Sequence, residues 1–297
     1  MGRMKKRNTS LLSTFLVIIA LAVYSFFGLN EDPSGDNFPL QITFMDVGQG
    51  DSILIQSGDS TMLIDAGPTS ASDEIISELE KNNIKKIDIL IGTHPHEDHI
   101  GSLDTVIQKF DIGRIYMPQA VGTTKAYEDV ITAVKNKGLV INKPVAGTSL
   151  EFGDAECVFL APNNSTYEDL NNYSIVIKLV YGETSFIFTG DAEALSEKEM
   201  LEKGYDLKAD VLKVGHHGSS TSTAKDFLES VDPVYAVIMC GKDNSYGHPH
   251  RETMEKLKEK GIIVYRTDEC GTIVCSSDGE NILFNVDPGS YKNGSSK

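Results

Sequence analysis

An apolar run that ends in a cluster of metal-binding side chains is the feature that most restricts the fold of this chain. Residues 87–91 read Ile-Asp-Ile-Leu-Ile, which has the length and composition of a buried β-strand. Three histidines and an aspartate follow within six positions, namely His94, His96, Asp98 and His99. Imidazole and carboxylate groups together suit zinc or a similar first-row divalent ion. The pattern therefore predicts a metal site at the end of a strand.

The spacing within this cluster predicts two groups of ligands. Alternate residues of an extended segment point to the same side, so His94 and His96 can hold one ion. Apolar residues then recur at helical spacing over 100–110, which places Asp98 and His99 at a strand-to-helix corner where they can face a second ion. Asp98 is also a plausible helix N-cap, and a single histidine could be an ordinary loop residue. The complete run favours metal binding.

The segment from His94 to Gly101 resembles the signature of the metallo-β-lactamase superfamily. The resemblance implies an α/β fold, an αβ/βα sandwich of two mixed sheets flanked by helices, with two divalent ions, zinc or manganese, at one edge. It implies that Asp191, which ends an apolar strand, bridges the two ions. It also implies that Asp65 lies beneath the metal histidines and orients one of them, with a turn-forming role as the alternative.

Two histidines in tandem follow another predicted strand at 209–215. They should point in opposite senses, so only one can easily bind a given ion. The final ligand histidine of the superfamily usually precedes a glycine, so the resemblance favours His217 as the ligand of the second ion and leaves His216 to meet the substrate, with the reverse order as the alternative. Members of the superfamily often place a further histidine upstream of the bridging aspartate. In this chain that region holds the amide side chains of Asn171 and Asn172 and the hydroxyl of Ser174 instead. We therefore expect the first metal site to bind its ion more weakly.

Six motifs together resemble the hydrolase domain of ComEC-type competence proteins, over residues 40 to 285. They are D-V-G-Q-G-D-S (46–52), H-P-H-E-D-H-I-G (94–101), N-N-Y-S-I-V-I-K-L (171–179), F-T-G-D-A-E (188–193), K-V-G-H-H-G-S (213–219) and Y-G-H-P-H (246–250). ComEC proteins are multi-span DNA-uptake channels whose hydrolase domain is thought to degrade one strand, whereas this chain has one hydrophobic segment. Exported phosphorylcholine esterases show a similar tandem-histidine arrangement.

Both of these families cleave phosphodiesters. We therefore predict an extracytoplasmic metal-dependent phosphodiesterase, nuclease-like, that uses a metal-bridged hydroxide and acts on a phosphodiester or ester, with DNA among the candidates. Asp98, His216 and His248 are the predicted catalytic residues, and His248 would donate to an oxyanion or protonate a leaving group. His250 is expected to begin a helix. The alternatives are an esterase or lactonase acting on a small molecule or cell-wall substituent and, last, a non-catalytic binding domain.

The charge of the chain gives no support to nucleic-acid binding. The formal net charge is −16, and four of the 27 basic residues precede position 8. The remaining chain therefore carries 23 basic against 43 acidic residues. Nucleic-acid-binding proteins usually show clustered lysine and arginine. Tryptophan is absent and arginine is rare after the N-terminus, so no arginine–aromatic surface for stacking on single strands is evident.

The N-terminus predicts a membrane anchor. Residues 11–29 are uncharged and mostly apolar, which is about enough to cross a bilayer of roughly 30 Å, and the basic flank should stay in the cytoplasm. A cleaved signal peptide is the alternative, because residues 20–22 have the A-x-A form, and the protein would then be secreted. Residues 30–37 are expected to be a linker, 38–288 the hydrolase domain and 289–297 a polar tail. No protein partner is evident.

The rest of the chain alternates strands and helices. Strands 262–266, 271–275 and 281–285 are expected to finish the second sheet. The glycines of loop 46–52 are attributed to packing. Four cysteines lack C-x-x-C spacing, and buried free thiols are favoured over a bridge between Cys270 and Cys275.

Overall fold

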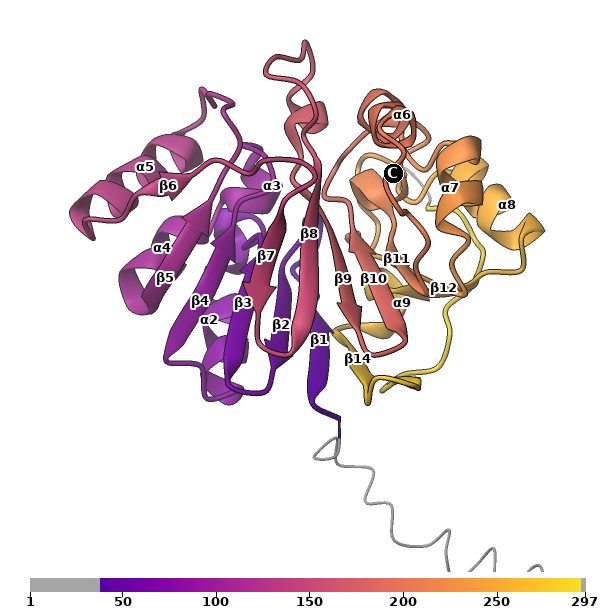
Figure 1. Ribbon diagram of the computed structural model, residues 1–297, viewed down its shortest axis with the longest axis horizontal. Coiled ribbons are helices and arrows are strands. Elements are labelled where there is room, and N and C mark those ends of the chain that lie inside the picture. Colours follow the sequence, from indigo (N-terminus) through magenta and orange to yellow (C-terminus); the bar gives the residue numbers. More distant parts are fainter. Residues whose placement is uncertain (1–37, 295–297) are drawn as a thin grey trace, which may run out of the picture. The chain divides into compact units, whose positions relative to one another are not determined.

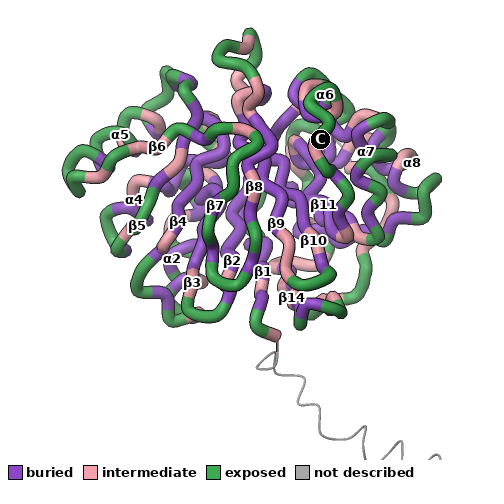
Figure 2. Tube along the Cα trace, in the orientation of Figure 1, coloured by how far each residue is buried: buried purple, intermediate pink, exposed green. Residues whose placement is uncertain are grey.

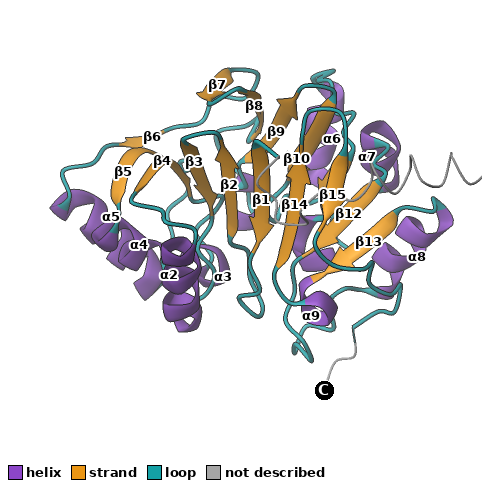
Figure 3. Ribbon diagram, turned by 90° about the horizontal axis from the view of Figure 1, so that it is seen from below, coloured by secondary structure: helices purple, strands orange, loops and turns teal. Residues whose placement is uncertain are grey.

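Two β-sheets packed face to face form the centre of the fold, and helices cover the outer face of each (Figure 1, Figure 3). The computed structural model describes residues 38–294. The first sheet has eight strands, in the order β15 (Ile282–Phe284), β14 (Ile273–Ser277), β1 (Leu40–Phe44), β2 (Ile53–Ser57), β3 (Ser60–Ile64), β4 (Lys86–Ile91), β5 (Asp111–Tyr116) and β6 (Ile141–Asn142).

The second sheet has seven strands, in the order β13 (Ile263–Arg266), β12 (Tyr235–Ile238), β11 (Val211–Lys213), β10 (Thr184–Phe188), β9 (Val176–Tyr181), β8 (Ala155–Ala161) and β7 (Ser149–Phe152). Each sheet mixes parallel and antiparallel pairs: β3 runs parallel to β4 but antiparallel to β2, and β10 runs parallel to β11 but antiparallel to β9. The predicted αβ/βα sandwich of two mixed sheets is confirmed.

The helices divide between the two outer faces. On the first sheet lie α2 (Ser72–Lys81), α3 (Glu97–Ile100), α4 (Leu103–Lys109) and α5 (Lys125–Asn136), and α6 (Ala194–Glu202), α7 (Lys225–Val231) and α8 (Arg251–Glu259) lie on the second. A short helix, α9 (Thr267–Cys270), follows β13. The pattern at 194–202 did not indicate α6, because its buried residues include Ser196 and Glu197 and form no apolar stripe.

The central strands are buried along most of their length (Figure 2), and their successive side chains face opposite sides of the sheet. In β4, Ile89 and Ile91 enter the core between the sheets, while Leu90 packs against the helices on the outer face. Strand β4 is therefore buried on both faces and reads as a continuous apolar run, the pattern of a covered parallel strand. This burial holds the following residues, which carry the predicted ligands, at the edge of the sandwich.

The prediction that β14 and β15 finish the second sheet is wrong. β14 pairs antiparallel with β1 of the first sheet, with Ile42 opposite Cys275, and β15 pairs with β14. Alternation along β14 places Ile273 and Cys275 in the core between the two sheets. These side chains would be buried there whichever sheet β14 joined, so the apolar pattern does not identify the sheet. By joining the first sheet, β14 covers the otherwise open edge of β1.

The four cysteines are free thiols; Cys157, Cys240 and Cys275 are buried, while Cys270 is half-buried. The described part of the predicted polar tail packs on the domain, where the Tyr291 hydroxyl donates to the carbonyl of Ile262 at 2.6 Å. The predicted anchor and linker lie outside the described residues. Within residues 38–294 there is no helix with the length and apolarity needed to cross a bilayer.

Candidate metal centre

The predicted ligands meet where parallel strands of both sheets end. Asp65 follows β3, His94 follows β4, Asp191 follows β10 and His217 follows β11. Because β3 and β4 are parallel, as are β10 and β11, the residues after these strands emerge at the same edge. Open α/β sheets commonly bind ligands outside the carboxyl ends of their strands. The fold thus brings distant parts of the chain to one place.

His94 and His96 form one side of the cluster. His94 is fully buried, and its Nε2 lies 3.0 Å from Nδ1 of His96. On its other side, Nδ1 of His94 lies 3.4 Å from the hydroxyl of Ser174 and 3.1 Å from that of Thr93. The paired nitrogens of His94 and His96 can therefore face one ion, as the alternation predicts.

A second group consists of Asp98, His99, Asp191 and His217, whose ligand atoms all lie within 4.8 Å of one another. Asp98 and His99 lie in α3, at the predicted strand-to-helix corner. Asp98 Oδ2 lies 3.2 Å from His217 Nε2, and His99 Nε2 lies 3.2 Å from Asp191 Oδ1. Two imidazoles and two carboxylates are a donor set that suits a divalent first-row ion.

Asp191 lies between the two groups. Its Oδ2 is 3.9 Å from His94 Nε2 and 3.5 Å from His217 Nε2, while its Oδ1 faces His99. Its backbone N–H donates to Ser174, which also lies against His94. One carboxylate is thus in reach of both predicted ion positions, which is the arrangement that a bridging ligand needs.

The donor atoms that face this space are buried and lack hydrogen bonds. His99 Nε2, His217 Nε2 and Asp191 Oδ1 have no hydrogen-bond partner among residues 38–294. Buried polar atoms in folded proteins nearly always have partners, so three such atoms pointing at one space call for an explanation. A bound cation supplies it, and the residues present therefore fit a metal centre.

The charges in the cluster agree with this explanation. Burial alone would lower the pKa of His217, but Asp191, Asp51 and Asp98 raise it to about 10. Burial alone would also lower the pKa of His99, but the carboxylates of Asp191 and Asp65 raise it well above its usual value. Without metal, protons on these imidazoles therefore balance the buried carboxylates, and a divalent ion can replace them.

Asp65 supports the cluster from below, as predicted. Its Oδ2 lies 2.8 Å from Nδ1 of His99 and accepts a hydrogen bond from the hydroxyl of Thr93 at 2.7 Å, and its Oδ1 accepts from the Thr93 N–H at 2.7 Å. Asp65 is fully buried. A carboxylate bound to Nδ1 leaves Nε2 of His99 free to bind an ion and fixes the orientation of the ring.

His216 and His217 differ from the extended geometry assumed in the sequence analysis. Both adopt left-handed backbone conformations, with φ of 49° and 54°, so strand alternation does not separate them. His217 is buried and faces Asp98 and Asp191, whereas His216 is 23% exposed and its Nδ1 lies 3.3 Å from Glu193. His216 Nε2 also lies 3.7 Å from Asp191 Oδ2, and the order with His217 toward the ion and His216 toward the substrate stays a prediction.

The region without a third histidine supplies positioning groups. Ser174 contacts His94 and Asp191 as described above. Asn172 Oδ1 accepts from the N–H of Ser196, which makes its role structural. Asn171 Oδ1 is buried without a hydrogen-bond partner among the described residues. The amide nitrogen of Asn171 lies 3.4 Å from Glu193 and 3.5 Å from Nδ1 of His216, and the weaker first metal site stays a prediction.

Loop 46–52 contributes more than packing, and sequence reasoning missed its role. A Cβ on Gly50 would lie 2.3 Å from the carbonyl oxygen of Asp98, so packing does explain that glycine. However, Asp51 is buried and its Oδ1 lies 3.3 Å from His217 Nδ1, while Oδ2 pairs with Lys213. A lone lysine within the apolar strand at 209–215 was the signal that could have revealed a buried ion pair.

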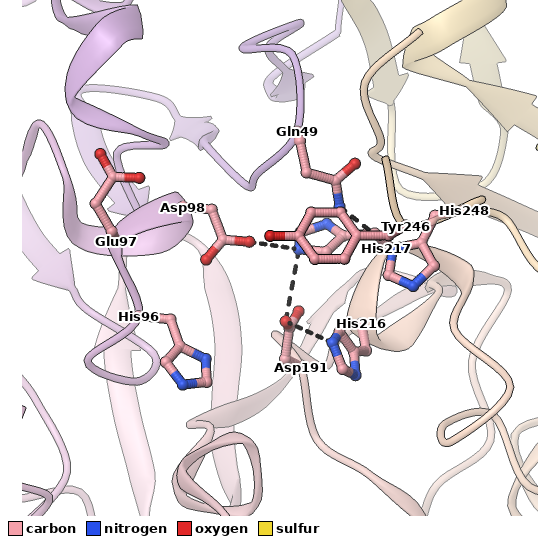
Figure 4. Close-up of a pocket in the computed structure, with 9 residues that line it drawn as sticks. All are labelled: Gln49, His96, Glu97, Asp98, Asp191, His216, His217, Tyr246 and His248. Carbon is pink, nitrogen blue, oxygen red and sulfur yellow. Dashed lines mark hydrogen bonds and ion pairs between the residues drawn. The ribbon is translucent and has the colours of Figure 1, made fainter. Parts of the chain in front are cut away.

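A cavity of about 300 Å³ opens beside the cluster (Figure 4). His96, Glu97 and Asp98 lie on one side, and His216 and His248 lie opposite with Asp191 between them. The complete lining is Gln49, His96, Glu97, Asp98, Asp191, His216, His217, Tyr246 and His248. Gln49, Glu97 and Tyr246 were not among the predicted site residues.

His248 lines the cavity, whereas His250 lies at the start of α8, and the catalytic role of His248 stays a prediction. Nδ1 of His248 lies 3.3 Å from the side-chain nitrogen of Gln49, and burial together with His217 lowers the pKa of His248 to about 3. A neutral imidazole can donate a hydrogen bond to an oxyanion, whereas it is a poor proton source at neutral pH. His250 precedes α8 and accepts from the N–H of Ser220, outside the cavity lining.

Residues 45–242 match the sequence profile of the family described as the Metallo-beta-lactamase superfamily. The ComE operon protein 3 of Bacillus subtilis is 34% identical to this chain over 251 residues, which cover 78% of this chain and 32% of that protein. The chain therefore spans about a third of the length of this relative. The predicted membership of the superfamily and the resemblance to ComEC-type proteins are confirmed.

Two further comparisons extend over most of the partner's length. The Exodeoxyribonuclease YycJ of Bacillus anthracis is 22% identical over 234 residues, 72% of this chain and 87% of that protein. Igni18, a metallo hydrolase of the archaeon Ignicoccus hospitalis, superimposes with a TM-score of 0.52 at 14% identity and covers 79% of this chain and 98% of its own. This structural likeness concerns the fold alone.

Proposed function

This chain is a metal-dependent hydrolase of the metallo-β-lactamase superfamily, and from that premise we propose that it is a phosphodiesterase that acts on nucleic acid. The observation that carries the proposal is the position of Asp191, whose carboxylate is in reach of both His94 and His217. A carboxylate in this position would be shared by two ions if they bind, and such a pair of ions would stabilise the charge that grows on phosphate. The similarity to an exodeoxyribonuclease supports the same reaction class.

The side chains around the cavity would have different roles in this reaction. When bound, a pair of divalent ions supplies positive charge to phosphate oxygens and acidifies water. His94 and His96 would hold one ion, and Asp98, His99 and His217 the other, with Asp191 shared. His248, held by Gln49 and neutral, can donate a hydrogen bond to a phosphate oxygen. His216, partly open to solvent on the same side, is placed to give a proton to the leaving oxygen.

The charge of the cavity favours a second candidate, an esterase or lactonase that acts on a small molecule. None of the described residues that line the cavity is lysine or arginine, and Glu97 and two aspartates add negative charge. A long polyanion gains little from such a surface. A small ester needs no basic groove, and a cavity of about 300 Å³ lies at the lower end of the sizes usual for small ligands.

One experiment separates these candidates. The purified chain is analysed for metal content, reconstituted with zinc or with manganese, and assayed in parallel on single-stranded DNA, bis-p-nitrophenyl phosphate and a panel of lactones. Cleavage of DNA and of the diester is expected. Turnover of lactones without diester cleavage would replace the proposal with the second candidate, and inactivity with every metal would favour a binding domain.

The location of the enzyme is a separate proposal. We propose that residues 11–29 anchor the chain in the cell membrane and that the hydrolase domain lies outside the cytoplasm, because a basic flank precedes an uncharged apolar run. Protease added to intact spheroplasts is expected to digest the domain, and alkaline extraction should leave the chain in the membrane. A mature N-terminus at Val23 would replace the anchor with a cleaved signal peptide.

A further inference from the structure

Tyr246 lies at the cavity with most of its side chain in solvent. It lines the space beside the metal ligands, yet 65% of the residue is exposed. It belongs to the loop between β12 and α8, and in Figure 4 its ring lies in front of His217. A large aromatic ring in this position leaves a flat apolar surface available to a ligand that occupies the cavity.

The loop that carries Tyr246 is held by several hydrogen bonds. The side-chain oxygen of Asn244 accepts from the N–H groups of Tyr246 at 3.1 Å and His248 at 3.0 Å, and its nitrogen donates to the carbonyls of Gly241 and His248. Nε2 of His250 lies 3.1 Å from the Tyr246 carbonyl. The backbone at Tyr246 is thus held in place before a ligand binds, which reduces the conformational entropy lost on binding.

The ring of His248 lies between Tyr246 and the metal cluster. Tyr246 stacks on His248 with ring centroids 5.6 Å apart and planes 18° apart, and the rings of His248 and His217 lie 6.0 Å apart. Tyr246 lines the same cavity as Asp98, Asp191 and His217, and the ring of His248 lies between Tyr246 and His217. In a nucleotide, one sugar joins the base to its phosphate, so a base on Tyr246 and its phosphate at the cluster can occupy this one cavity.

The charge of the cavity makes this ring important for a nucleic acid. Because lysine and arginine are missing from the described lining, side chains offer no ionic contact to phosphates beyond the one at the metal centre. Stacking of a base on an aromatic side chain needs no charge and tolerates any sequence. The acidic composition gives no support to an extended basic surface, whereas stacking on a single ring does not depend on the net charge.

We propose that Tyr246 is the stacking platform for one unpaired nucleobase, that of the nucleotide whose phosphate lies at the metal centre. The inference rests on the proposed phosphodiesterase function and narrows its substrate class to single-stranded nucleic acid or small nucleotide diesters. A paired base is stacked within its duplex and cannot lie on the ring.

The test uses two diesters with the same leaving group, the p-nitrophenyl ester of thymidine 5′-monophosphate and methyl p-nitrophenyl phosphate. With the metal-reconstituted chain, kcat/KM is expected to be higher for the thymidine ester. Tyr246→Leu should lower the ratio of the two kcat/KM values by roughly 5- to 150-fold, mainly through KM, since base stacking on an aromatic ring has this size. Tyr246→Trp should keep the ratio. Tyr181→Leu, at the far end of β9, is the matched control and should keep it too.

The outcomes separate this inference from the function on which it rests. Hydrolysis of both esters with the same ratio in wild type and Tyr246→Leu overturns the platform and leaves the phosphodiesterase in place. If neither ester is hydrolysed, the phosphodiesterase proposal fails, and binding of thymidine 5′-monophosphate, followed by calorimetry on wild type and Tyr246→Leu, decides the platform. Weaker binding to the leucine variant supports it, and equal binding overturns it.

Discussion

The ammonium group of Lys213 lies 2.6 Å from the carboxylate of Asp51, and both side chains are buried beneath the metal cluster. The other oxygen of Asp51 faces His217. Lys213→Met would leave a buried carboxylate without its partner, at a cost of about 3–5 kcal/mol in the free energy of unfolding. The double variant Asp51→Leu, Lys213→Met removes both charges and should recover most of that loss. Urea unfolding of the single and double variants measures the difference. A double variant that is less stable than Lys213→Met would contradict this account.

Asp191→Ala and Asp98→Ala should abolish hydrolysis. Asp191 is in reach of both ion positions, so its loss should also lower the metal content below two equivalents, whereas Asp98→Ala should affect one. We expect activity to fall more than about 100-fold, beyond the range typical of residues that only orient ligands. His250→Ala, which lies outside the cavity lining, is the control and should be mild. Full activity in Asp191→Ala would refute the bridging role.

Asp65→Asn should weaken metal binding without removing a ligand. The carboxylate orients His99 through a contact of 2.8 Å, and loss of such a partner typically costs about 10- to 100-fold in metal affinity. Competition with a chromophoric chelator measures the affinity directly. Asp88→Asn changes a carboxylate in the same sheet that binds the N–H of Thr61 instead, and its metal affinity should match that of the wild type. Equal affinity in Asp65→Asn and wild type would mean that Asp65 only shapes its turn.

The stability of the fold should depend on pH through Glu197. Burial raises its pKa from 4.5 to about 7, although hydrogen bonds from the N–H groups of Ala224 and Thr223 oppose the shift. A carboxyl whose pKa is higher in the folded state stabilises the fold below pH 4.5 and loses that contribution as the pH rises through 7. The free energy of unfolding should therefore fall by roughly 3 kcal/mol over this window.

Glu197→Gln isolates this contribution, because it keeps the shape and cannot ionise. Urea unfolding of both proteins at pH 4.5 and pH 7.5, at the same metal content, is the measurement. The wild type should lose more stability than the variant between the two values. Parallel curves for the two proteins would show that the two N–H donors hold the carboxylate ionised throughout.

The sandwich of two mixed sheets and the place of the histidine cluster at the end of a strand could be predicted from sequence. The run at 87–91 is apolar because both faces of β4 are covered, and a histidine cluster beside it has few uses other than metal binding. Asp191 and His217 were predicted as ligands from the resemblance to the superfamily, which rests on short motifs at strand ends. These patterns are local in sequence, so they can be recognised without knowledge of the fold.

What only the tertiary structure decided is which distant groups share a contact. The partner of β14, the pairing of Lys213 with Asp51 and the position of Tyr246 beside His248 all join segments far apart in the chain. An alternating pattern shows that a strand has one face toward the core, but that face would be buried in either sheet. A buried charge shows that a partner exists, but not which one. These choices depend on packing and on electrostatic balance in the assembled core, and no local pattern of residues carries that information.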